Sequence, residues 1–227
     1  MRMPMFRAFL SIILREIRLN LGNHGGAFLP AAFFAGAILI LPFSIGPDPE
    51  MLRKIGAGYL WLALALACLV SLERLFQGDI DDGSLDQILL GNLPLSIIML
   101  GKTLGQWIAV AIPLMFAVPI AGLMINIETQ YILPLTFQLF IGSLAMFLIG
   151  AIGSALGAGV RRGGLLVALL SLPLYTPIII FGSGAASQVI MGNGIFSQGF
   201  LLICTICLVA IVLAPIAIAA AIKLHAE

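Results

Sequence analysis

Two short patterns in this sequence contain residue types that bind phosphate or exchange electrons. Residues 101–103 read G-K-T, like the end of a phosphate-binding loop, and Cys204 and Cys207 form a C-x-x-C pair. The phosphate loop requires a glycine where Ser96 stands, and it requires a preceding strand, so we reject this interpretation. A redox pair needs an accessible thiolate, but both cysteines lie in an apolar run. This placement favours small packing residues.

Other groups that could carry chemistry are also isolated. His24 and His225 have no partner at the spacing of metal or haem ligands, which favours interfacial histidines. The apolar segments contain almost no ionisable residues, and this argues against an ion-coupled carrier, a channel with a charged ring and a membrane-embedded enzyme. We therefore expect no catalytic residue, no metal site and no firmly bound cofactor. The energy for any transport would come from another chain.

The composition indicates a protein that is solvated by lipid. Of its 227 residues, 61% are hydrophobic and 9% are charged, whereas about a quarter are charged in soluble domains. The net charge of +1 argues against a nucleic-acid partner. We predict an all-α integral membrane protein, a single transmembrane domain over residues 1–227. Its six predicted spans are 27–43, 56–72, 95–125, 132–160, 164–181 and 200–222.

The third predicted span is unusually long for one crossing of a bilayer. We expect it to tilt, to kink at Pro113 or Pro119, or to re-enter the membrane. The distribution of Lys and Arg then predicts the orientation. Nine of these residues fall on one side of the membrane, and only Arg53 and Lys54 fall on the other. Because basic residues are retained in the cytoplasm, both termini are predicted to be cytoplasmic.

Gly153 and Gly157 form a G-x-x-x-G pattern in the fourth predicted span. Small residues at this spacing allow two helix backbones to approach closely. The pattern would suit a contact between subunits, or ordinary packing within one chain. We favour packing within the chain, because such contacts are common in membrane proteins.

The segment 5–21 has the spacing of an amphipathic helix that lies in the membrane interface. Charged residues lie largely between its apolar positions. The segment could be a simple anchor or the cytoplasmic elbow helix of a transporter subunit, and both readings stay open at this point. The apolar positions are Phe6, Phe9, Leu10, Ile13, Leu14, Ile17 and Leu21.

The stretch 73–102 contains the densest group of polar residues, including seven charged side chains. Asp82 and Gly83 form a turn signal, and Ser84 could cap a short helix. That helix would place Leu85, Ile88 and Leu89 on one face, where they could dock another protein. Alternatively, this stretch is a solvated loop that folds back on the bundle, and the residues alone favour neither reading.

The same stretch resembles the first cytoplasmic loop of ABC transporter permeases of the ABC-2 type. The resemblance lies in E-R at 73–74, G-S-L-D at 83–86, L-P-L-S at 93–96 and G-K at 101–102, with Asp86 where the family usually has Glu. It implies that residues 73–95 carry a coupling helix for a cytoplasmic ATPase and that residues 1–22 form the elbow helix. The implied coupling residues are Glu73, Arg74, Asp82, Gly83, Ser84, Leu85, Asp86, Ile88 and Leu89.

A narrower resemblance covers nearly the whole chain. The segments LPFSIGPDP at 41–49, LERLF at 72–76, VRRGG at 160–164 and LPL at 172–174 are similar to the CcmB family. These proteins are the haem exporter B permeases of bacterial cytochrome c maturation. The resemblance implies a multi-pass protein of the bacterial inner membrane with haem as its candidate substrate.

The family resemblance also implies partners. These are a cytoplasmic ATPase subunit (CcmA-like), a haem-handling membrane protein (CcmC-like), a small membrane subunit (CcmD-like) and, indirectly, a periplasmic haem chaperone (CcmE-like). The permease would form a homodimer in a two-plus-two assembly. Either haem itself crosses this subunit, or ATP hydrolysis releases the loaded chaperone. The lack of a haem ligand pair in the spans favours release. Alternatives are an ABC-2 permease for another substrate and a scaffold that translocates nothing.

Overall fold

The computed structural model describes residues 5–22, 26–46, 48–73, 75–81, 83–84, 93–160 and 163–224. Within these ranges the chain is helical apart from short turns, with no strand. This result confirms the all-α prediction. The helices are α1 (Met5–Gly22), α2 (Phe28–Ile45), α3 (Pro49–Leu72), α4 (Gln77–Asp81), α6 (Leu95–Met124), α7 (Thr129–Gly157), α8 (Gly163–Ile190) and α9 (Gln198–Leu224).

Six helices are long and apolar enough to cross a membrane, namely α2, α3, α6, α7, α8 and α9. Each of them overlaps one of the six predicted spans, in the same order. The long third span is one continuous helix, α6, that contains both Pro113 and Pro119. The re-entrant alternative for this span is therefore wrong.

Two helices are longer than the sequence suggested. The second span begins at Pro49 instead of residue 56, because Asp48 caps α3 by accepting from the backbone N–H groups of Glu50 and Met51 at 3.0 and 3.3 Å. A proline in the first turn loses no helical hydrogen bond. Helix α8 continues to Ile190, nine residues beyond the predicted end at 181. Its glycine- and serine-rich last part has the composition of a loop.

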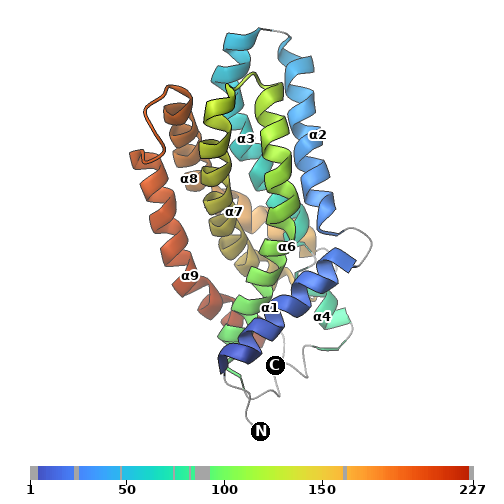
Figure 1. Ribbon diagram of the computed structural model, residues 1–227. Coiled ribbons are helices and arrows are strands. Elements are labelled where there is room, and N and C mark those ends of the chain that lie inside the picture. The colour runs from blue at the N-terminus through green and yellow to red at the C-terminus, as the bar shows by residue number, and fades with distance from the viewer. Residues whose placement is uncertain are drawn as a thin grey trace.

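The helices form a bundle around α7, which packs against α3, α6, α8 and α9. Helix α1 crosses the lower end of the bundle in Figure 1, and α4 lies at the same end. The last turn of α9 also ends there, whereas the α2–α3, α6–α7 and α8–α9 connections lie at the opposite end. The start of α1 and the end of α9 are thus on one side, as six crossings require.

The centre of the bundle is packed around Trp61 of α3, which is fully buried. Its indole ring lies directly on Gly142 of α7 and Gly182 of α8, and a Cβ atom at either glycine would overlap the ring. We call Trp61, Gly142 and Gly182 the Trp61 seam. Large apolar side chains such as Phe43 and Leu133 point outward, 85% and 77% exposed. This outward apolar surface fits a lipid environment.

Candidate functional site

The structure describes three of the nine residues that were predicted to couple the loop to an ATPase. These three are Glu73, Gly83 and Ser84. The other six lie outside the described residues, and so does the docking helix predicted to begin at Ser84. These six are Arg74, Asp82, Leu85, Asp86, Ile88 and Leu89. His24, His225, Arg161 and Arg162 also lie outside the described residues.

Within the loop, the structure contains a one-turn helix, α4, that sequence analysis did not predict. It is closed by Gly83, whose backbone has φ +71° and whose N–H donates to the Ile80 carbonyl at 3.3 Å. Glycine adopts this left-handed conformation without the steric cost that other residues incur. Gln77 accepts from the backbone N–H of Gly159 at 3.2 Å, which ties α4 to the residues after α7.

Glu73 lies at the junction between α3 and α8. Its carboxylate packs against Gly164, in the first turn of α8, and a Cβ atom at position 164 would overlap it. A negative side chain at the start of a helix interacts favourably with the helix dipole. The ABC-2 resemblance places Glu73 and Arg74 among the coupling residues, and because Arg74 lies outside the described residues this role stays a prediction.

The most unusual feature at this end is a group of buried charges. The Lys102 ammonium, in the second turn of α6, lies 2.6 Å from Glu16 Oε1 of α1 and 2.6 Å from Asp79 Oδ2 of α4. The Ser84 hydroxyl donates to the other Asp79 oxygen at 3.1 Å. We call Glu16, Asp79, Ser84 and Lys102 the charged junction. It joins three elements that are far apart in the sequence.

The junction is largely shielded from solvent. Lys102, Glu16 and Asp79 are 3%, 6% and 7% exposed. Removing two carboxylates and an ammonium from water costs several kcal/mol for each ion unless the charges are paired. The three side chains therefore depend on one another, and their arrangement fixes where α1 and α4 sit on α6.

Two glycines beside Lys102 bring α1 close to α6. A Cβ atom at Gly101 would lie 3.1 Å from a methyl group of Ile12, and one at Gly105 would lie 2.9 Å from the Ile13 carbonyl oxygen. This is the close backbone approach that small residues four apart permit. The G-K-T segment rejected as a phosphate loop is therefore part of a helix-packing surface.

Sequence analysis missed the junction, although two signals point to it. Glu16 shares a face of α1 with Ile12, Ile13 and Ile17, so it places a charge on the apolar side of an amphipathic helix. Lys102 is the one charged residue of the long helix α6. A charge in either setting requires a partner, but the pairing itself joins residues 86 positions apart. Only the fold brings them together.

Gly153 and Gly157 both face α8 of the same chain. A Cβ atom at Gly153 would lie 2.7 Å from the Ser171 hydroxyl oxygen, and one at Gly157 would lie 2.9 Å from the Gly163 carbonyl oxygen. Within α9, Cys204 and Cys207 are free thiols, the first half-buried and the second buried. The described residues contain no group of three or more His, Cys, Asp or Glu that could hold a metal ion.

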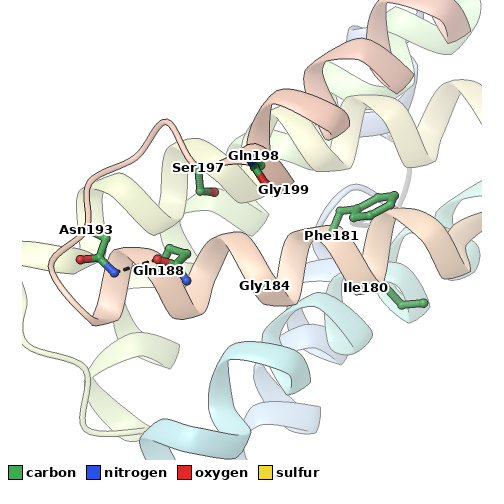
Figure 2. A pocket seen from close by; sticks show the side chains of 8 residues that line it. All are labelled: Ile180, Phe181, Gly184, Gln188, Asn193, Ser197, Gln198 and Gly199. Atoms are coloured by element: carbon green, nitrogen blue, oxygen red, sulfur yellow. Dashed lines mark hydrogen bonds between the residues drawn. The ribbon is translucent and has the colours of Figure 1, made fainter.

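A groove of about 450 Å³ lies between α8 and α9 at the end far from α1 and α4 (Figure 2). Amide and hydroxyl groups line part of it, and Asn193 donates to the Gln188 side chain at 2.7 Å. None of its eight lining residues is charged. This groove contains no pair of groups suited to acid–base or nucleophilic catalysis.

The fold and the junction define a class. The chain is a multi-pass helical membrane protein. It buries a charged junction at the end of the bundle where α1 lies and where α9 ends. Comparison with known proteins narrows this class to a family. Residues 7–225 match the family model described as CcmB protein.

Curated relatives agree with this match. The chain is 39% identical to "Heme exporter protein B" of Bradyrhizobium diazoefficiens, over 95% of this chain and 97% of that protein. It is 38% identical to the protein of that name from Pseudomonas aeruginosa, over 97% and 98%. With the Escherichia coli K12 protein the identity is 34%, over 96% and 99%. The chain belongs to the CcmB family.

Proposed function

We propose that this chain is the permease subunit of an ABC transporter complex that acts in bacterial cytochrome c maturation. The observation that carries the proposal is the match to the CcmB family over residues 7–225. Relatives named "Heme exporter protein B" align with nearly the whole chain. Haem is therefore the proposed substrate, or the cargo of the chaperone on which the complex acts.

The proposed location is the bacterial inner membrane. In the proposed orientation, both termini lie in the cytoplasm. Nine of eleven basic residues support it. In this orientation α1 is the elbow helix at the cytoplasmic interface. Helix α4, which belongs to the proposed coupling loop between α3 and α6, lies at the same end of the bundle (Figure 1).

The proposed mechanism uses a separate ATPase subunit for hydrolysis. ATP closes an ATPase dimer, the coupling loops of two permease copies move with it, and the spans tilt as rigid bodies. The haem-handling and small membrane subunits would join this assembly, and the periplasmic chaperone would be its client. The two histidines lie before α2 and after α9, outside the six spans. Their position favours release of the loaded chaperone over passage of haem through this subunit.

Deletion of the gene tests the physiological role. We expect all c-type cytochromes to disappear from haem-stained gels of periplasmic and membrane fractions, and to return with a plasmid copy. Accumulation of haem-loaded chaperone would indicate release rather than haem transport. Unchanged cytochromes would refute the maturation role and leave an ABC-2 permease for another substrate or a scaffold. Transport assays with the reconstituted complex would separate those two.

Two substitutions test the coupling loop. Gly83→Pro cannot keep φ +71°, and Leu85→Asp removes an apolar side chain from the proposed docking helix. Both are expected to lower ATPase co-purification and cytochrome yield while the chain still inserts. Gly194→Pro is the matched control, because Gly194 also has positive φ, +85°, and open space around it at the opposite end. Equal losses in Gly83→Pro and Gly194→Pro would argue against a specific coupling role.

A further inference from the structure

We propose that Lys102 is a positioning residue that makes the coupling loop, α1 and the start of α6 move as one body. The inference rests on the proposed function in one respect, namely that the loop is where an ATPase acts. It assigns a role to the charged junction, which neither the family match nor the loop motif requires.

The first argument is the connectivity of the charges. Glu16 and Asp79 belong to different elements, and each reaches the same ammonium at 2.6 Å. Ser84 donates to one oxygen of Asp79, and the other oxygen has no hydrogen bond among the described residues and is held by its charge contact with Lys102. If the loop moved away from α6, it would leave buried charges unpaired, which is strongly unfavourable.

The second argument is the packing of α1 on α6. Glycines at 101 and 105 bring the backbone of α1 against α6, with Gly105 facing the Ile13 carbonyl. At this distance α1 cannot slide along α6 without contacting side chains that flank the glycines. The ion pair and the glycine contacts therefore hold the same two helices in one register.

The third argument is the position of the next contacts along α6. One turn beyond Lys102, the Gln106 amide donates to the carbonyl and hydroxyl of Ser71 in α3 at 2.5 and 2.9 Å. The Trp107 indole donates to the Ser143 hydroxyl in α7 at 3.0 Å. A displacement of the loop that carries α6 with it would therefore act directly on the second and fourth spans.

The first test replaces the shared cation. Lys102→Met removes the charge, and Lys223→Met is the control at an exposed lysine in the last turn of α9. In membranes that hold the full complex, we expect Lys102→Met to keep ATPase co-purification and ATP hydrolysis while cytochrome c yield falls about tenfold, a typical size for coupling between sites. Full yield in Lys102→Met, or loss of hydrolysis and yield in equal proportion, would overturn the inference.

The second test replaces the ion pair with a covalent bond. The Cβ of Ile12 and an ideal Cβ at Gly101 are 3.4 Å apart, close to the separation in disulfides. We would combine Ile12→Cys and Gly101→Cys with Cys68→Ala, Cys204→Ala and Cys207→Ala. After oxidation by diamide, which takes up the two electrons and two protons of the thiols, this bond is expected to restore cytochrome yield in Glu16→Gln but not in Asp79→Asn. Only the first variant loses a contact between α1 and α6.

Restoration of both variants, or of neither, would contradict the separate roles of the two carboxylates, and so would full yield in unbonded Glu16→Gln. The rate of disulfide formation, followed by maleimide-polyethylene glycol labelling, needs no transport activity. We expect it to be several-fold slower with Lys102→Met than without it, and an unchanged rate would overturn the inference by itself. Normal cytochromes after gene deletion would instead refute the proposed function.

Discussion

The charged junction and the Trp61 seam both join three elements, but they do so by different physics. In the junction, one ammonium holds two carboxylates at 2.6 Å. In the seam, a flat ring rests on two glycines, and the contact is apolar. The junction lies at the end of the bundle with α1 and α4, whereas the seam lies among α3, α7 and α8.

This difference has a mechanical consequence. Apolar packing is spread over many contacts that each contribute little, so no single atom carries the attachment. Buried ion pairs are concentrated in a few atoms, and the loss of one partner leaves a charge without compensation. We therefore expect α3, α7 and α8 to behave as a stable body. The attachment of α4 to α6 should depend on single charged residues, whereas α1 is held on α6 by the glycine contacts as well as by its ion pair.

Loss of the shared cation is the largest effect that this comparison predicts. Lys102→Met is expected to lower the free energy of unfolding by about 3–5 kcal/mol, because it leaves Glu16 and Asp79 buried without a counter-charge. Unfolding by sodium dodecyl sulfate in mixed micelles would measure it. The control Lys223→Met should change the free energy little. A loss for Lys102→Met as small as that for the control would show that the junction is hydrated in the membrane.

Filling the seam should have a smaller effect. Gly142→Ala and Gly182→Ala each place a methyl group where the Trp61 ring lies, and overpacking of this kind costs about 1–3 kcal/mol. The same unfolding experiment, followed by tryptophan fluorescence, would report both the loss and a changed environment of the ring. Gly184→Ala is the matched control in α8, because nothing lies within 4 Å of its new methyl group. Equal stability of Gly182→Ala and Gly184→Ala would mean that the ring moves aside freely.

Much of the fold follows from local sequence. Apolar length predicts the six spans, and the periodicity of residues 5–21 predicts α1. The predicted helix boundaries are wrong where local composition and packing favour different conformations. Arg53 and Lys54 lower the hydropathy of the first turns of α3, so hydropathy predicts a start at residue 56 and not at Pro49. Gly182 and its neighbours have the composition of a loop, yet Gly182 lies within α8. Its backbone, which has no side chain, contacts the Trp61 ring directly.

The charged junction could not be predicted from the sequence, and the reason is physical. The segment G-K-T and Glu16 each have several possible roles when seen alone. Their shared role depends on α1 folding across α6, a contact between residues 86 positions apart. Local periodicity carries no information on such a pairing. A buried charge does signal that a partner exists, but the fold determines which one it is.

The smallest predicted effect concerns the one exposed ion pair among the described residues. Arg53 and Glu128 lie 3.6 Å apart at the opposite end, with side chains 37% and 54% exposed. Arg53→Gln is expected to change the free energy of unfolding by less than about 1 kcal/mol. Salt at about 1 M should remove even this difference, because the screening length then falls to about 3 Å, which is shorter than the 3.6 Å between the two charged groups. The loss in Glu16→Gln should persist at the same salt concentration, because its partners are shielded from the solution.

If both variants lost the same stability and responded equally to salt, burial would not distinguish the two pairs, and the junction would have no special mechanical role. If only Glu16→Gln keeps its loss at high salt, the low dielectric around Lys102 maintains the attachment of α1. The buried ion pair between Lys102 and Glu16 would then be stronger than the exposed pair between Arg53 and Glu128 at the opposite end. The end with α1 and α4 would be the one suited to receive force from another subunit.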